Sequence, residues 1–179
     1  MKRLFYLVDQ MDNVEAISED LHDEGITDWR FHILSRDDAG LFTRRLHSAT
    51  LFDRTDLARY TERGALAGAL FGLTFIATAQ WAQAFTMPSV AWIALFLFMT
   101  AAGAFIAGFG GIGTENYRIR RFHDAIENGQ HLVMVDVKQK DEQRMKELMA
   151  ERHPEADLQQ ETSSFNNPFV EQDGKPHLF

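Results

Sequence analysis

One stretch of the sequence, from Gly64 to Thr114, contains no Asp, Glu, Lys, Arg or His over 51 consecutive residues. That length accommodates two helices of about 20 residues each, the length that crosses a hydrocarbon core of roughly 30 Å. The charged residues of the chain all lie in the two flanking segments. The stretch therefore predicts a transmembrane helical hairpin, residues 64–113, inserted between two polar flanks.

The predicted hairpin divides into two spans at a short turn. The first span covers about residues 64–86 and the second about residues 88–111, with Pro88 at the start of the second helix. Trp81 and Trp92 lie near the turn. Tryptophan is enriched where a membrane meets water, so we expect both residues at the membrane interface.

Arginines lie on both sides of the hairpin, and the turn between the spans has none. Because positively charged loops stay in the cytoplasm, this pattern predicts a two-pass protein with both termini cytoplasmic. An arginine near anionic lipid headgroups gains about 1 kcal/mol. The arginines expected to contact headgroups are Arg44, Arg45, Arg63, Arg118, Arg120 and Arg121. Ordinary positive-inside flanks without specific lipid contacts explain the same arginines equally well.

Small residues recur every four positions in both spans. The two rows are Gly64, Gly68 and Gly72 in the first span and Gly103, Ala107 and Gly111 in the second. Each glycine costs a soluble helix about 1 kcal/mol relative to alanine, whereas in lipid small residues let helix backbones approach closely. The rows therefore predict tight helix packing, either within one chain or between chains.

The segment GFGGIG, from Gly108 to Gly113, has the G-x-G-x-x-G spacing of a dinucleotide-binding loop. Such a loop needs a short strand before its first glycine and an acidic residue at the end of the next strand. Here a long apolar run beginning at Pro88 precedes the motif, and Glu127, near the expected offset, lies in a helix-like segment. The motif is interpreted as the end of a membrane helix, and no cofactor is expected.

The two flanks have the same order of predicted elements, namely strand, helix, strand. Residues 1–37 and 131–165 each supply one such unit, and two of them in series make a ferredoxin-like βαββαβ domain. The predicted fold class is an α+β membrane protein whose ferredoxin-like cytoplasmic domain is split by the inserted hairpin. Amphipathic connector helices are expected over residues 38–63, another connector helix over 114–130, and an extended tail over 166–179.

The first and third strands of this domain are expected at the centre of the sheet because they are nearly continuous apolar runs. Both faces of these strands are apolar, although helices cover only one face in this fold. The pattern therefore predicts a self-association face formed by Phe5, Leu7, Val133 and Val135. The connecting helices or the tail are alternative covers for the second face.

The sequence gives little sign of catalytic chemistry. The formal net charge of −8 argues against nucleic-acid binding, and the absence of cysteine excludes disulfides and thiolate chemistry. The seven histidines lack metal-binding spacing, and Ser35, Ser48 and Ser163 lack a nucleophile motif. No catalytic residue, cofactor or metal is expected. Within the hairpin there is no ionisable residue of the kind that marks ion-coupled transport.

The stretch ISEDLHDEGITDWRFHILSRDDAGLFTRRLHSAT, continued by DRTDLARYTERGALAG, resembles a family of small bacterial membrane proteins. These proteins have a glycine-rich hairpin between ferredoxin-like halves and are akin to the general-stress-protein domain family. The resemblance implies a bacterial inner-membrane location. It supplies no catalytic residue, and some relatives carry the label of magnesium transporter.

Three functions follow as hypotheses. The first is a non-enzymatic, homo-oligomeric inner-membrane scaffold or stress-associated element, whose partners are further copies of itself and membrane lipids. The second is a ring-forming channel or transporter subunit, with magnesium as the candidate ion. The third is a membrane-tethered sensor of a small ligand, which rests on fold analogy alone.

Overall fold

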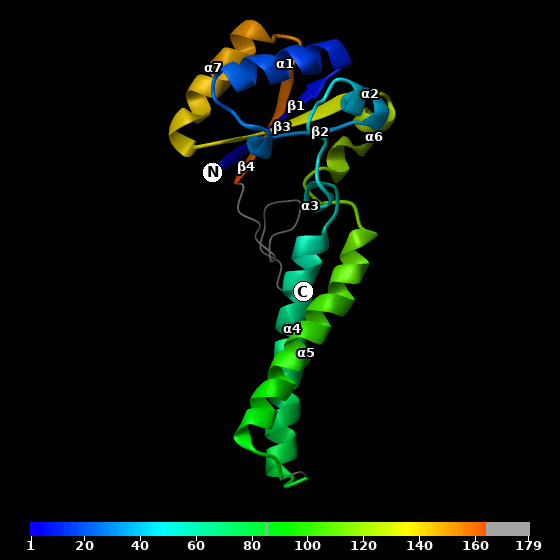
Figure 1. The fold of residues 1–179 in the computed structure, drawn as a ribbon, viewed down its shortest axis with the longest axis vertical. Coiled ribbons are helices and arrows are strands. Elements are labelled where there is room, and N and C mark those ends of the chain that lie inside the picture. Colours follow the sequence, from blue (N-terminus) through cyan, green and yellow to red (C-terminus); the bar gives the residue numbers. More distant parts are fainter. Residues whose placement is uncertain (85, 164–179) are drawn as a thin grey trace. The chain divides into compact units, whose positions relative to one another are not determined.

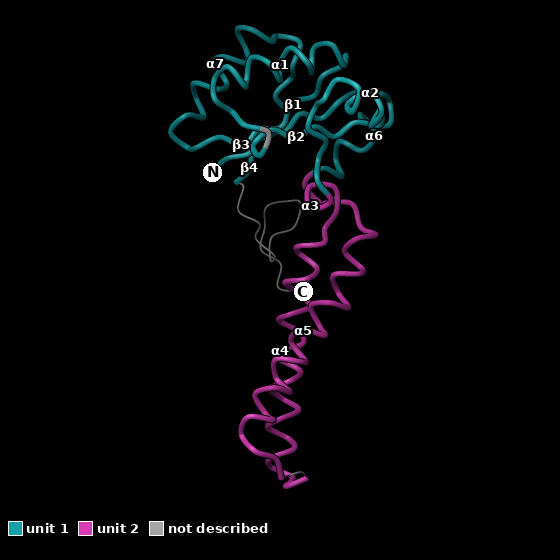
Figure 2. The backbone as a smooth tube through the Cα atoms, viewed as in Figure 1, with its two compact units in different colours: residues 1–50, 119–166 teal, residues 51–118, 167–179 magenta. Residues whose placement is uncertain are grey.

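The computed structural model describes residues 1–84 and 86–163, and these residues form two compact units. The sheet unit contains Met1–Thr50 and the chain from Ile119 to Ser163, so it is assembled from two distant segments (Figure 2). The hairpin unit contains Leu51–Arg118. The expected extended tail, 166–179, lies outside the described residues.

The sheet unit contains a four-stranded antiparallel sheet in the order β2-β3-β1-β4. Its strands are β1 (Lys2–Val8), β2 (Phe31–Leu34), β3 (His131–Val137) and β4 (Asp157–Ser163). The prediction that the first and third strands are central is confirmed by this order. It follows from composition, because every residue of β3 is buried whereas β4 is mixed, as suits an edge strand.

Strand β2 is also fully buried, although it lies at the other edge of these four strands. The chain returns alongside it after α2 (Asp38–Thr43). The Ile33 amide donates to the His47 carbonyl at 3.0 Å, and the Ala49 amide donates to the Ile33 carbonyl at 2.7 Å. This parallel bridge protects the edge from pairing with another chain.

Helices α1 (Met11–Asp23) and α7 (Glu142–Arg152) pack on one face of the sheet (Figure 1). Side chains at helical spacing on α1, Val14, Ile17 and Leu21, are fully buried there. Met145 and Met149 of α7 join the same core. Burying an apolar side chain of this size stabilises a fold by about 1.5–3 kcal/mol, so this layer is the main core of the unit.

The second face of the sheet is covered by the segment that enters β3, which includes η2 (Arg120–Phe122) and α6 (His123–Glu127). Phe122 stacks on Phe5 with ring centroids 5.9 Å apart. Ile126 packs against the same cluster as Phe5, Leu132 and Met134. Of the three covers considered from the sequence, the structure therefore shows the connecting segment in this place.

The predicted self-association face is corrected by the strand register. Phe5 pairs with Met134 and Leu7 with Leu132, whereas Val133 and Val135 pair with Tyr6 and Leu4. Directly opposed residues of an antiparallel pair lie on the same face. Phe5 and Leu7 therefore lie on the face covered by α6, and Val133 and Val135 lie on the opposite face under α1 and α7. The four residues do not form one surface.

The hairpin unit consists of α3 (Leu51–Arg54), α4 (Leu57–Trp81) and α5 (Ser89–Ile112). Helix α4 begins before the expected residue 64 and includes a charged first section. The segment 38–63, expected to form connector helices, thus contributes α2 to the sheet unit and α3 and the start of α4 to the hairpin unit.

Candidate functional site: the helical hairpin and its polar base

Helices α4 and α5 approach each other through the predicted small residues. A Cβ atom added at Gly64 would fall on the carbonyl oxygen of Gly103 and on the Ala107 methyl group. A Cβ atom added at Gly68 would fall on the carbonyl oxygen of Met99. The two backbones therefore touch at these positions, and no side chain larger than hydrogen fits without moving a helix.

The row on α5 makes the reciprocal contacts. A Cβ atom at Gly103 would meet the Gly64 carbonyl oxygen and lie 2.9 Å from the Gly68 Cα atom. At Gly111 it would lie 2.8 Å from the Tyr60 Cβ atom and 2.9 Å from the Leu57 Cα atom. Gly72 is less tight, since its nearest contact is the Met99 Cβ atom at 3.2 Å. The two rows thus meet within one chain, which the sequence left open.

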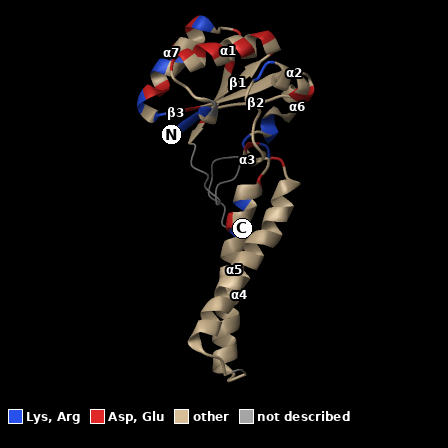
Figure 3. Cartoon of the chain, viewed as in Figure 1, with Lys and Arg blue, Asp and Glu red and all other residues tan. Residues whose placement is uncertain are grey.

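The opposite surfaces of the two helices carry large apolar side chains. Exposed examples on α4 are Leu66, Leu70, Phe71 and Phe75, and on α5 they are Ile93, Leu97, Phe98, Phe105 and Ile106. Beyond the first turns of α4 the helices bear no Lys, Arg, Asp or Glu (Figure 3). Both helices are long and apolar enough to cross a membrane.

The two tryptophans lie at the turn end of the hairpin. Trp81 is the last residue of α4 and is 87% exposed, and Trp92 lies in the first turn of α5 and is partly buried. Both are therefore at the turn end of the helix pair, and their place at a membrane interface stays a prediction.

At the other end of the hairpin lies a buried polar cluster that was not predicted from the sequence, formed by Asp56, Arg59 and Tyr117. Asp56 and Arg59 are only 4% and 6% exposed. The Arg59 Nη1 atom lies 3.7 Å from an Asp56 carboxylate oxygen, and the guanidinium lies 4.7 Å from the centre of the Tyr117 ring. Arg59 lies in the arginine-containing flank before the hairpin, but it faces inward because both an acid and an aromatic ring are in reach.

Asp56 joins the two ends of the hairpin through its backbone and its side chain. Its amide donates to the Thr114 carbonyl at 2.9 Å, and its carboxylate accepts from the Tyr117 amide at 3.3 Å. Its own carbonyl accepts from the Tyr60 amide and so begins α4. We call the cluster of Asp56, Arg59 and Tyr117 the polar base of the hairpin. The one sequence signal for it is an acid and a base three residues apart where the helix begins.

The six arginines expected at lipid headgroups lie in different environments. Arg44 forms ion pairs with Asp12 at 2.6 Å and Glu15 at 2.5 Å, and these contacts raise its pKa. Arg44 therefore joins α1 to the end of α2, and its contact with lipid headgroups stays a prediction. Arg118 donates to the Tyr117 hydroxyl at 3.0 Å.

The remaining four arginines of this set differ again. Arg121 stacks over Phe122 at 4.7 Å and donates to the Gln159 carbonyl at 3.1 Å. Arg45, Arg63 and Arg120 have exposed side chains. The exposed members of the predicted set are therefore divided between the sheet unit and the hairpin unit.

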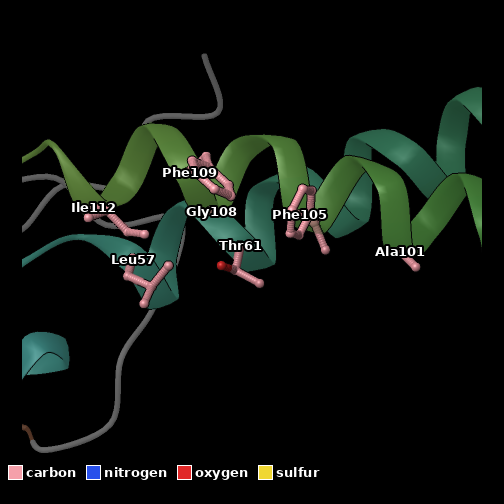
Figure 4. Close-up of a pocket in the computed structure, with 8 residues that line it drawn as sticks. Leu57, Thr61, Ala101, Phe105, Gly108, Phe109 and Ile112 are labelled. Carbon is pink, nitrogen blue, oxygen red and sulfur yellow. The ribbon is translucent and has the colours of Figure 1, made fainter.

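An apolar groove of 460 Å³ runs along the hairpin between α4 and α5 (Figure 4). Among the described residues, Thr61 is the one lining residue with a polar side chain. Phe105 and Phe109 form one wall with ring centroids 5.1 Å apart. Gly108, from the glycine motif, lines the floor, and a Cβ atom there would lie 2.7 Å from the Thr61 hydroxyl oxygen. The motif is thus part of a helix contact rather than of a loop.

Among the histidines of the sheet unit, His131 and His153 form hydrogen bonds to residues far away in the sequence, which the sequence did not predict. His131 Nδ1 lies 2.8 Å from the Ser35 hydroxyl, and burial lowers the pKa of His131. His153 lies 3.0 Å from Asp20 through Nε2. Within residues 1–84 and 86–163, no three side chains of the metal-binding types come together.

Comparisons with known proteins gave no further assignment. No family model, curated protein or solved structure matches the chain.

Proposed function

We propose that this chain is a two-pass protein of a bacterial inner membrane whose hairpin anchors a cytoplasmic domain with a ferredoxin-like fold. The supporting observation is how side chains are distributed on the hairpin. The small residues face the other helix of the pair, and large apolar side chains face outward. In water such an outward surface is costly, whereas in lipid it is matched to its surroundings.

The strand order and connectivity support the ferredoxin-like assignment. Each half contributes strand, helix, strand, and the sheet order β2-β3-β1-β4 places the first strand of each half at the centre. The hairpin would then replace the short connection that normally joins the second and third strands. A hairpin that crosses the membrane twice would place both segments of the domain on the same side. The arginines in both flanks agree with a cytoplasmic position for that side.

Within this arrangement we propose a non-enzymatic role as a homo-oligomeric membrane scaffold or stress-associated element. Because the glycine rows pack within one chain, copies would associate through other surfaces, either the outward side chains of the hairpin or the cytoplasmic domain. The magnesium-channel alternative rests on the resemblance alone, since the uncharged stretch offers no ionisable group for an ion path.

The membrane topology is tested by cysteine labelling, which this chain permits because it contains no cysteine of its own. Thr86→Cys places a thiol in the turn of the hairpin, and Lys140→Cys places one on the sheet unit; both positions are exposed. In spheroplasts, a membrane-impermeant maleimide should label the first variant only. In inverted vesicles it should label the second only. Labelling of both variants from one side would contradict the two-pass topology.

The scaffold is tested separately by native mass spectrometry of the full chain in lipid nanodiscs. A defined assembly of several copies is the expected result. A monomer at all protein densities would refute the homo-oligomeric scaffold but leave the topology intact. The channel alternative is tested by measuring magnesium flux across sealed liposomes that contain the protein. The absence of flux would refute this alternative.

A further inference from the structure

The sheet unit contains a second cavity, remote in sequence from the hairpin, with a volume of 230 Å³. It is formed where α1 ends, where the chain leaves β3, and along one side of α7. Pockets for drug-sized ligands are about 300–1,000 Å³. A cavity of this size therefore suits a smaller molecule.

The floor of this cavity is apolar. Ile26 and Met145 are 8% and 6% exposed and belong to the main core of the sheet unit. Leu148 is partly buried and packs against the same core. A ligand with a short aliphatic group would cover these side chains and remove apolar surface from water.

The rim of the cavity is charged, and its charges divide into two kinds. Arg144 and Glu24 form an ion pair with each other. Arg30, Lys138 and Asp141 also line the cavity, and within the described ranges 1–84 and 86–163 they make no side-chain hydrogen bond or ion pair. Two cations and one carboxylate are thus left to bind a ligand.

We propose that this cavity binds a free α-amino acid with an aliphatic side chain. Its carboxylate would be bound by Arg30 and Lys138, its ammonium group by Asp141, and its side chain would lie on the floor of Ile26, Met145 and Leu148. Charge-assisted hydrogen bonds of this kind are the strong ones. A simple anion would leave Asp141 as a repelling charge, whereas a zwitterion satisfies all three groups.

The binding is tested by isothermal titration calorimetry of the full chain in nanodiscs, with leucine as the probe. Leucine without its amino group, 4-methylpentanoate, tests the ammonium contact. We expect Arg30→Gln, Lys138→Gln and Asp141→Asn each to weaken leucine binding by roughly tenfold or more, the effect of losing one hydrogen bond to a charged group. Asparagine caps a helix as well as aspartate does, so Asp141→Asn keeps the start of α7.

Lys140→Gln is the matched control, because Lys140 is an exposed lysine beside the cavity that does not line it. This variant should bind leucine as the parent chain does. Failure of leucine to bind at millimolar concentration would overturn the proposal, as would equal binding of 4-methylpentanoate or an equal loss in Lys140→Gln. All residues that line the cavity belong to the sheet unit, so leucine binding can fail while the proposed membrane topology and scaffold role stand.

Discussion

Gly103→Ala, with Gly110→Ala as its control, tests the close approach of α4 and α5. Both glycines lie on α5, and both substitutions add one methyl group to a helix. At Gly103 the new Cβ atom would meet the Gly64 carbonyl oxygen and lie 2.9 Å from the Gly68 Cα atom. At Gly110 the atom nearest to the new Cβ atom would be the Tyr60 Cδ1 atom at 3.8 Å, an ordinary contact distance.

The expected magnitudes have opposite signs. Alanine is favoured over glycine inside a helix by about 1 kcal/mol, and this gain applies at both positions. At Gly103 it is opposed by overpacking, which typically costs about 1–3 kcal/mol. Here the cost should be at the upper end because the obstacle is backbone of α4, which cannot rotate away. We expect Gly110→Ala to be neutral or stabilising and Gly103→Ala to lower the free energy of unfolding by about 1–2 kcal/mol.

The assay is reversible unfolding of the full chain in mixed micelles by increasing the fraction of SDS. Fluorescence of Trp81 and Trp92, at the turn end of the hairpin, reports its opening once Trp29 of the sheet unit is replaced by Phe. Equal effects of the two alanine variants would refute the reasoning, because then the backbones do not touch at Gly103. Stabilisation by Gly103→Ala would refute it more strongly.

Three further changes test other parts of the molecule. The Tyr6 hydroxyl is buried without a hydrogen bond within the described residues, and burial raises its pKa to about 12. Because a buried polar group without a partner is costly, Tyr6→Phe should raise the free energy of unfolding, measured in urea, by about 1 kcal/mol. Asp56→Ala should destabilise the hairpin by about 3–5 kcal/mol in the SDS titration, because it leaves the buried Arg59 charge without its carboxylate. Arg59→Met, which removes that charge, should cost less, and an equal cost would contradict this account. Burial lowers the pKa of His131, so the unfolded chain binds the proton more readily. Stability should therefore be full above about pH 6.5 and fall as the pH drops below the unfolded pKa, and in urea titrations His131→Gln should flatten this dependence.

Local patterns allowed the sequence to predict the elements of both units. A strand or helix is specified by residues within a few positions of one another. The apolar runs of β1 and β3 and the small-residue rows of α4 and α5 could therefore be recognised from the sequence alone. The central position of β1 and β3 also followed, because only a strand covered on both faces needs continuous apolar residues.

The candidate sites were harder to predict because their members come from distant segments. Arg44 appeared as one of several flanking arginines, and only the position of α1 pairs it with Asp12 and Glu15. The polar base joins Asp56 and Arg59 to Tyr117, on the far side of the hairpin in sequence. No local period connects such residues, since their proximity depends on how the chain returns.

The sequence by itself determined that an uncharged helical hairpin separates two strand, helix, strand segments, because charge and hydrophobic period are local properties. Only the tertiary structure decided that the glycine rows meet each other within one chain, and which side chains share a face of the sheet. The face on which each side chain lies depends on the register between neighbouring strands. Alternation along one strand is visible in the sequence, but a shift of one residue between strands moves every side chain to the opposite face, and that shift is set by long-range pairing.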